Sequence, residues 1–262
     1  MRIWHQSMTV LEDLPDYAAR LSAHIRTVVR ADTQVVLHGL LPGTYLANYP
    51  GSDIGYAALF ALHSLQFPLQ ALNAEKSGFD AFAACTLVDP LLREARSLVR
   101  IPVVAAGETC FRAATEGGRK FGMLIFIDRM IQHYEEQVRY LGLSGHCVGI
   151  EPVGFTFKDV VNSFDDPGCV KDLFAGAARR MIAKGAQAII PGEVPMNLLL
   201  TTSGMCEVDG VPLLDSLALT LQAAQAAVDA PLRQHPGWVG DKVPRERLEQ
   251  VLRFYGLDRF LK

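Results

Sequence analysis

Short apolar runs alternate with amphipathic segments along most of the chain. The runs predict strands at residues 2–5, 35–37, 78–86, 101–104, 120–127, 148–152 and 185–193, and the segments between them predict helices. The run at 120–127 is almost continuously apolar, which is typical of a parallel strand covered on both faces. The alternation predicts an α/β fold built on parallel sheets.

Two of these apolar runs have the same sequence pattern. Both the run at 78–86 and the run at 185–193 open on Gly, carry Ala at the fourth place and end on a polar residue, so that Thr86 aligns with Glu193. Each is followed by another apolar strand that contains Pro. We therefore expect two halves that are divergent copies. Because parallel α/β sheets bind ligands at the carboxyl ends of their strands, Thr86 and Glu193 are predicted to lie on opposite walls of one cleft.

Three further segments add to this outline. Residues 39–53 form a predicted loop, rich in Pro and Gly and long enough to act as a lid or a wall of the cleft. Asp89 and Pro90 have the residue types of a helix start. The tail from 231 to 262 breaks the alternation and contains a predicted helix at 245–254. Its aromatic residues should pack on the same chain or on a neighbouring subunit, which leaves a homo-oligomer as an open alternative. These aromatic residues are Trp238, Phe254, Tyr255 and Phe260.

The amino-acid composition argues against nucleic acid and membrane partners. Half of the 262 residues are hydrophobic, enough for the core of one large or two small domains. A net charge of -3 provides no basic field for a phosphate backbone, so no nucleic acid partner is expected. No apolar run approaches the ~20 residues of a membrane-spanning helix, and the amino-terminal segment lacks the apolar core of a signal peptide. We expect a cytoplasmic protein without a membrane partner.

The cysteines do not predict a disulfide framework or a zinc site. They form an odd set without paired short spacing, which is typical of reduced thiols. Most free cysteines are small buried hydrophobic residues. The set comprises Cys85, Cys110, Cys147, Cys169 and Cys206.

Four segments together resemble the aspartate/glutamate/hydantoin racemase superfamily, and the likeness extends over most of the chain except the tail. The segments are residues 78–90, 101–108, 133–136 and 185–193. The resemblance implies two flavodoxin-like halves related by a pseudo-twofold axis, a site between them, a small-molecule substrate and no cofactor or metal. We expect residues 1–104 and 216–262 to form the first half with a C-terminal helical extension, and residues 105–215 to form the second.

In racemases of this family, one cysteine at the end of each catalytic strand takes or gives a proton on one face of a substrate carbon. This sequence departs from that pattern at both places. Thr86 stands where the resemblance implies the first thiol, with Cys85 one residue earlier, and Glu193 stands where it implies the second. The chain thus resembles a divergent member that lacks the aligned cysteine pair.

The residue types at these positions allow several roles. Glu193 is a candidate general acid or base if burial raises its pKa from about 4.3 towards neutrality; the plainer alternative is a helix cap or a partner of an arginine. Thr86 could donate a hydrogen bond to a substrate carbonyl or carboxylate, or be an ordinary loop residue. Because side chains alternate along a strand, only one of Cys85 and Thr86 should face the cleft, and we expect Cys85 to be buried.

Substrate contacts are expected from the ends of the other strands. Arg129 is the candidate partner for an anionic substrate, and Asn197 could orient Glu193, four residues earlier, if the segment is helical. Helix capping or surface exposure is the alternative for the others. The candidates at the strand ends are Gln6, Ser7, Glu108, Thr109, Asp128 and Arg129.

The leading functional hypothesis is a cofactor-independent racemase or isomerase that transfers a proton at an acidic carbon of a small carbonyl or carboxylate metabolite. With Glu193 and no aligned thiol pair, single-base chemistry is the more natural form, and Cys85 or a water could supply a second proton. The alternative is a hydrolase in which Glu193 activates water on a small amide, lactam or ester while Thr86 polarises the carbonyl. A non-catalytic binding protein is a further alternative.

Overall fold

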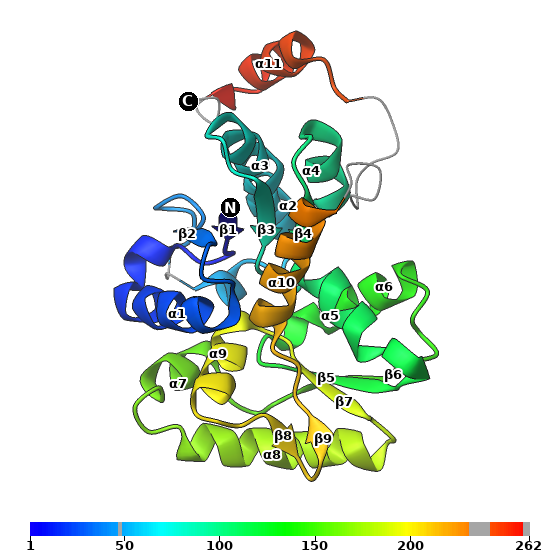
Figure 1. Ribbon diagram of the computed structural model, residues 1–262. Coiled ribbons are helices and arrows are strands. Elements are labelled where there is room, and N and C mark those ends of the chain that lie inside the picture. Colours follow the sequence, from blue (N-terminus) through cyan, green and yellow to red (C-terminus); the bar gives the residue numbers. More distant parts are fainter. Residues whose placement is uncertain (47–48, 231–241, 259–262) are drawn as a thin grey trace.

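The computed structural model describes residues 1–46, 49–230 and 242–258. Two separate parallel sheets form its framework (Figure 1). The first has the strand order β2-β1-β3-β4, and the second has the order β6-β5-β7. The strands are β1 (Arg2–Gln6), β2 (Gln34–His38), β3 (Ala81–Ala84), β4 (Val103–Ala105), β5 (Phe121–Ile125), β6 (Cys147–Pro152) and β7 (Ala188–Pro191). A short antiparallel pair, β8 (Glu207–Val208) and β9 (Val211–Pro212), follows the second sheet.

Helices connect and cover the strands, as parallel pairing requires. The α-helices are α1 (Pro15–Val28), α2 (Ala57–Ser64), α3 (Gln66–Lys76), α4 (Leu92–Leu98), α5 (Ala106–Ala114), α6 (Ile131–Tyr140), α7 (Phe157–Asn162), α8 (Gly168–Ala183), α9 (Val194–Thr202), α10 (Ser216–Asp229) and α11 (Arg245–Phe254). Single 3-10 turns are η1 (Leu11–Asp13), η2 (Pro50–Ser52), η3 (Glu116–Gly118) and η4 (Asp128–Met130). The predicted fold class, two parallel α/β halves and a C-terminal helix, is confirmed, whereas the division of the chain at residues 104 and 215 stays a prediction.

The two sheets are joined in the middle of the molecule by α10, which contacts both α5 and β3 (Figure 1). Asp215 caps this helix, because its Oδ1 accepts hydrogen bonds from the backbone N–H groups of Leu217 and Ala218, each at 3.1 Å. The same carboxylate accepts from His24 of α1 at 2.7 Å. The start of α10 is therefore tied to a helix that packs beside the first sheet.

The two strands expected to deliver the site end earlier than the pattern predicts. β3 ends at Ala84, which leaves Cys85 and Thr86 in the following loop, and β7 ends at Pro191. Gly192 follows because a Cβ there would overlap the Ile125 side chain. Glu193 is then the N-cap of α9, whose first turn tolerates a proline at position 195.

Asp89 does not begin the next helix as predicted, because α4 starts only at Leu92. Its carboxylate instead accepts hydrogen bonds from the backbone N–H groups of Gly107 at 2.7 Å and Glu108 at 2.6 Å, in the first turn of α5. Asp89 therefore accepts hydrogen bonds at the start of a helix, as predicted, but the helix is α5 and not the one that follows Asp89 in the sequence. The contact fixes the loop that follows β3 against the neighbouring βα unit.

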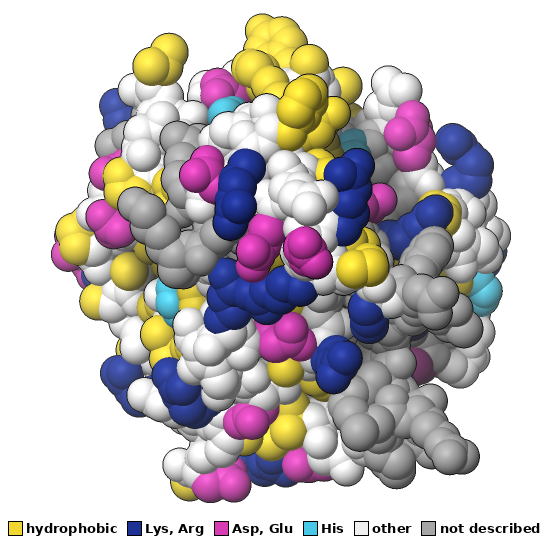
Figure 2. Space-filling view, turned by 90° about the horizontal axis from the view of Figure 1, so that it is seen from above, with side chains coloured by type: hydrophobic (Ala, Val, Ile, Leu, Met, Phe, Trp, Pro, Cys, Tyr) yellow, Lys and Arg dark blue, Asp and Glu magenta, His cyan; other side chains and the backbone are white. Residues whose placement is uncertain are grey.

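The C-terminal helix α11 begins and ends at the predicted residues. The face seen from above α11 carries interleaved acidic and basic side chains (Figure 2). Phe254 and Tyr255 are 82% and 68% exposed, so of the two alternatives left open by the sequence, packing on the same chain is not seen for these two residues, and packing on a neighbouring subunit stays a prediction. Trp238 and Phe260 lie outside the described residues. No helix in the described part of the chain is long and apolar enough to cross a bilayer.

Candidate active site

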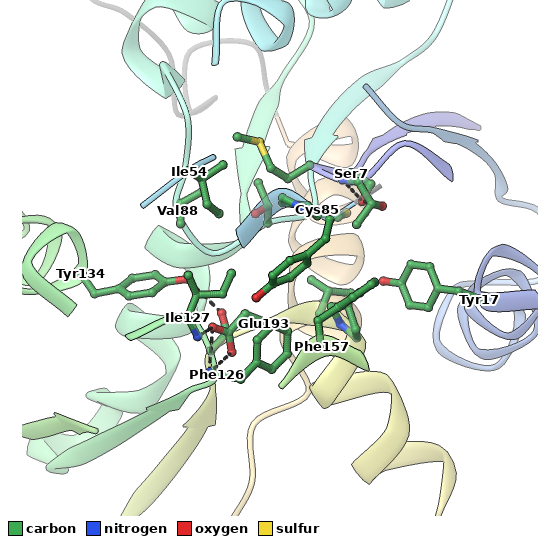
Figure 3. Close-up of a pocket in the computed structure, with 18 residues that line it drawn as sticks. Ser7, Tyr17, Ile54, Cys85, Val88, Phe126, Ile127, Tyr134, Phe157 and Glu193 are labelled. Atoms are coloured by element: carbon green, nitrogen blue, oxygen red, sulfur yellow. Dashed lines mark hydrogen bonds between the residues drawn. The ribbon is translucent and has the colours of Figure 1, made fainter. Parts of the chain in front are cut away.

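A cavity of about 50 Å³ lies between the carboxyl ends of the two sheets (Figure 3). The first-sheet side contributes Ser7, Met8, Thr9, Cys85, Thr86 and Val88, and the second-sheet side contributes Phe126, Ile127, Gly192, Glu193, Val194 and Pro195. Helices and loops add Tyr17, Tyr49, Pro50, Ile54, Tyr134 and Phe157. The space is where parallel α/β sheets bind ligands, and it is large enough for a few water molecules.

Glu193 is the acidic group of this cavity. Its residue is only 8% exposed, and its carboxylate accepts hydrogen bonds from the backbone N–H of Phe126 at 3.1 Å to each oxygen and of Ile127 at 3.2 Å. Burial raises the pKa of Glu193 to about 8, against the opposing effect of the two N–H groups and with a further increase from Asp128. A carboxyl with such a pKa gains and loses its proton near neutral pH, as a general acid or base must.

Cys85 and Thr86 both line the cavity. The expectation that only one of them faces it is wrong, because β3 ends at Ala84 and strand alternation does not continue beyond that residue. Cys85 is 2% exposed, as expected, and burial raises the pKa of its thiol, which therefore stays protonated at neutral pH. Figure 3 shows Cys85 on the side of the first sheet and Glu193 on the side of the second.

Tyrosine residues from three separate elements complete the wall. Tyr17 of α1 and Tyr134 of α6 point into the space from opposite sides (Figure 3). The Tyr134 hydroxyl donates to the carbonyl of Gly192 at 3.1 Å and so supports the residue before Glu193. Burial, with smaller contributions from Glu193 and Asp128, raises the pKa of Tyr49 to about 12. These phenols are neutral donors at physiological pH.

The sequence did not indicate the tyrosines as site residues. Tyr134 lies within the segment 133–136 that carries part of the family resemblance, which is a signal that could have found it. Tyr17 lies on the inward face of an amphipathic helix, where an aromatic residue is ordinarily part of the core. Tyr49 falls in the loop expected to form a wall of the cleft, and this part of the loop prediction agrees with the residues that line the cavity.

Among the residues predicted at other strand ends, only Ser7 lines the cavity, where its hydroxyl lies 2.7 Å from that of Thr9. Gln6 is fully buried beside it, but its amide bonds to the Trp4 indole and the Ser7 carbonyl. Thr109 donates to the carbonyl of the residue four positions earlier, in the first turn of α5. Gln6 and Thr109 are not among the described lining residues and are held by local bonds, so a substrate contact from either stays a prediction that these bonds do not favour.

The charged candidates are not among the described residues that line the cavity. Glu108 pairs with Arg96 at 2.8 Å and with Arg112 at 3.1 Å in a separate groove. Arg129 lies over the ring of Tyr56, with 4.7 Å from the guanidinium carbon to the ring centre. Arg129 is not among the described lining residues, and its contact with an anionic substrate stays a prediction. Asp128 is also outside the lining and acts on Glu193 only through its charge.

Asn197 does not orient the Glu193 carboxylate. Its Nδ2 donates to Asp215 at 2.9 Å and its Oδ1 accepts from the Ser216 backbone at 3.1 Å. The segment is helical, and the Asn197 backbone N–H does bond to the Glu193 carbonyl at 3.0 Å. However, Glu193 is the N-cap, so its side chain does not share a helix face with Asn197. Asn197 instead ties the helix that follows Glu193 to the start of α10.

The electrostatic character of the cavity is weakly acidic. None of its described lining residues is Lys, Arg or His, and the polar side-chain groups among them are hydroxyl groups, the Cys85 thiol and the Glu193 carboxyl. In the described part of the chain, no group of three or more His, Cys, Asp and Glu side chains is arranged as a metal site. An anionic ligand would meet Glu193 without a compensating cation, whereas a neutral carbonyl compound would find hydrogen-bond donors.

Comparison with known proteins decides the family. A family model described as Asp/Glu/hydantoin racemase matches residues 16–224, well over half of the chain. The chain belongs to the Asp/Glu/hydantoin racemase family. In this family member, Thr86 and Glu193 occupy the positions where the sequence resemblance implies the two thiols, and both line the cavity together with Cys85.

A curated relative of this racemase family is a hydantoin racemase of Rhizobium meliloti, 25% identical over 159 residues. The matched region covers 60% of this chain and 64% of that protein, slightly less than two thirds of its length. Allantoin racemase from Klebsiella pneumoniae superposes with a TM-score of 0.71 at 18% identity, over 87% of this chain and 88% of its own. Allantoin racemase from Pseudomonas fluorescens gives 0.68 at 18% identity, over 93% and 100%. These structural matches establish the shared fold.

Proposed function

We propose that the protein is a cofactor-independent racemase or isomerase in which Glu193 transfers a proton at an acidic carbon beside a carbonyl group. The observation that carries the proposal is the buried Glu193 carboxyl, whose pKa burial raises to about 8, on the wall of the cavity between the two sheets. Family membership supports this reaction class. The proposed location is the cytoplasm, as expected from the sequence.

The reaction follows from the positions of the groups. The ionised form of Glu193 removes the proton from the carbon and becomes a carboxylic acid, while the electron pair moves onto the carbonyl oxygen as an enolate. Hydroxyl groups of the cavity, including that of Thr86, donate hydrogen bonds to this oxygen. Return of the proton from Glu193 restores the same configuration. Inversion requires a proton on the opposite face, and we assign this role to the Cys85 thiol because it lines the cavity from the side of the first sheet.

The substrate of this reaction is proposed to be uncharged. A carboxylate would enter a cavity whose described lining holds Glu193 and no basic side chain, and an unpaired buried charge is costly. The names of the hydantoin and allantoin racemases that the chain resembles also point to cyclic amides. We therefore expect turnover of a cyclic amide with an acidic carbon in preference to aspartate or glutamate.

The test uses optically pure 5-benzylhydantoin, allantoin, L-aspartate and L-glutamate in D₂O. Proton NMR follows the loss of the hydrogen on the acidic carbon, and chiral chromatography follows inversion. Glu193→Gln should lower exchange by about a hundredfold or more, the scale of a lost general base. Glu108→Gln is the matched control, because this glutamate lies outside the cavity, and it should leave exchange per folded molecule unchanged.

A second variant separates proton removal by Glu193 from proton supply by Cys85. Cys85→Ala should abolish inversion but leave deuterium exchange with retention, since Glu193 alone performs that step. Retained exchange in Glu193→Gln would refute the assignment of the base. Incorporation of solvent oxygen into a ring-opened product, without exchange at the carbon, would refute proton transfer as the reaction.

A further inference from the structure

The cavity between the two sheets is lined mainly by buried residues. Its described lining residues are buried, except that Tyr49 and Thr86 are half-buried. The loop that holds Thr86 is fixed, because the Asp89 carboxylate near its end accepts two backbone bonds from α5. Tyr49 is therefore the part of the wall that a side-chain movement alone could open.

Tyr49 closes the cavity by meeting a residue from the opposite side. Its ring stacks on Phe157, the first residue of α7, with 5.0 Å between ring centres and 17° between ring planes. Its phenol end also lies against the backbone of Gly51. A Cβ at position 51 would overlap the Cζ and hydroxyl oxygen of Tyr49 and lie 2.6 Å from Cε1. The absence of a side chain at Gly51 therefore leaves the space that this ring occupies.

Described residues before and after Tyr49 make contacts that do not involve its ring. Before it, the Tyr45 hydroxyl donates to the Met8 carbonyl at 2.9 Å. After it, His63 and Asp53 form a hydrogen bond of 3.0 Å. Rotation of the Tyr49 side chain out of the stack breaks neither of these two contacts.

We propose that Tyr49 is the gating and size-determining residue of this cavity, and that its ring leaves Phe157 to admit a substrate and returns to enclose it. Closure of this kind removes water and strengthens the hydrogen bonds inside. This inference rests on the proposed function in one respect, that the substrate reacts inside the cavity. We further propose that the volume beside the Tyr49 ring determines the size of the largest substrate that the cavity accepts.

The test measures access to the cavity without any substrate. N-Ethylmaleimide alkylates Cys85 only when the reagent reaches the enclosed space, and peptide mass spectrometry separates this site from the exposed Cys169 and Cys206. Tyr49→Ala removes the ring, and Gly51→Ala displaces it without altering any residue that lines the cavity. Both should raise the alkylation rate of Cys85 about tenfold, the scale expected from losing one aromatic stack.

Two matched variants should keep the wild-type rate. Tyr49→Phe retains the ring, and Gly176→Ala adds a methyl group in α8 where no atom lies within 4 Å. Cys110 is fully buried outside the cavity lining and reports general loosening. An unchanged Cys85 rate in both test variants, or an equal acceleration at Cys110, would overturn the proposal. If Cys85 becomes accessible as expected while Glu193→Gln keeps full activity, the gate stands and the proposed function fails.

Discussion

The buried carboxyl of Glu193 makes a distinctive contribution to stability, which a single substitution can isolate. Its pKa rises from an ordinary value of 4.5 to about 8 because burial penalises the charged form. The folded protein therefore binds this proton more tightly than the unfolded chain. The resulting stability is fully present below pH 4.5 and is lost as pH rises to about 8. Glu193→Gln removes this titration.

The size of the change in stability follows from the pKa shift of Glu193. At about 1.4 kcal/mol per pKa unit, a rise from 4.5 to about 8 corresponds to about 5 kcal/mol between the two ends of the window. Two other buried groups titrate in or near this window, since burial raises the pKa of Asp89 to about 7 and lowers that of His5 to about 4. The pH dependence of the wild-type protein alone is therefore not diagnostic, whereas its difference from the variant is.

The assay is urea unfolding of the wild type and Glu193→Gln at intervals between about pH 5 and about pH 9. The free energy of unfolding of the wild type, relative to the variant, should fall as pH rises through this range. A constant offset from the amide is expected, since its NH₂ group cannot accept from the Phe126 and Ile127 N–H groups. A difference that does not change with pH, or that grows with pH, would refute the reasoning, because it would show that the N–H groups outweigh burial.

Three further outcomes are expected. Deuterium exchange should rise with pH and level off above about pH 8, because only ionised Glu193 removes a proton; a rate that falls across this range would contradict a carboxylate base. Gly107→Ala should lower the free energy of unfolding by about 1–3 kcal/mol in urea denaturation, because its Cβ would overlap the Leu87 carbonyl; wild-type stability would show that the loop yields freely. Asn197→Ala should lower the free energy of unfolding by about 1–3 kcal/mol in the same assay, since it removes one hydrogen bond to Asp215 and the one that holds the Ser216 backbone N–H; a change near zero, as at an exposed site, would contradict this network.

Periodicity predicted the framework because parallel strands and amphipathic helices leave a direct record in the pattern of apolar residues. The helix at 245–254 has the predicted ends. The ends of the two site-bearing strands were less predictable. Backbone bonding to the neighbouring strands determines where β3 and β7 stop, and that pairing is not encoded in the local pattern. For this reason Cys85 and Thr86 both line the cavity, although strict alternation would place one of them elsewhere.

Only the part of the candidate site that lies in the two repeated strand segments was predictable from the sequence. Alignment of the two copies predicted that Glu193 and Thr86 share one cleft, and both residues line the cavity. Tyr17 and Tyr49 were not predictable in this way, because they come from elements far apart in the sequence and reach the cavity only through tertiary packing. Arg129 was a reasonable partner for an anion by residue type. Its guanidinium instead lies over Tyr56, which no local pattern reveals.

The central claim is that a carboxyl in the place of a thiol transfers the proton. Proton NMR in D₂O, with optically pure 5-benzylhydantoin and allantoin as probes, tests it most directly. The wild type should replace the hydrogen on the acidic carbon with deuterium, and Glu193→Gln should lose about a hundredfold or more of that rate while Glu108→Gln keeps it. Equal exchange by the wild type and Glu193→Gln would contradict the claim.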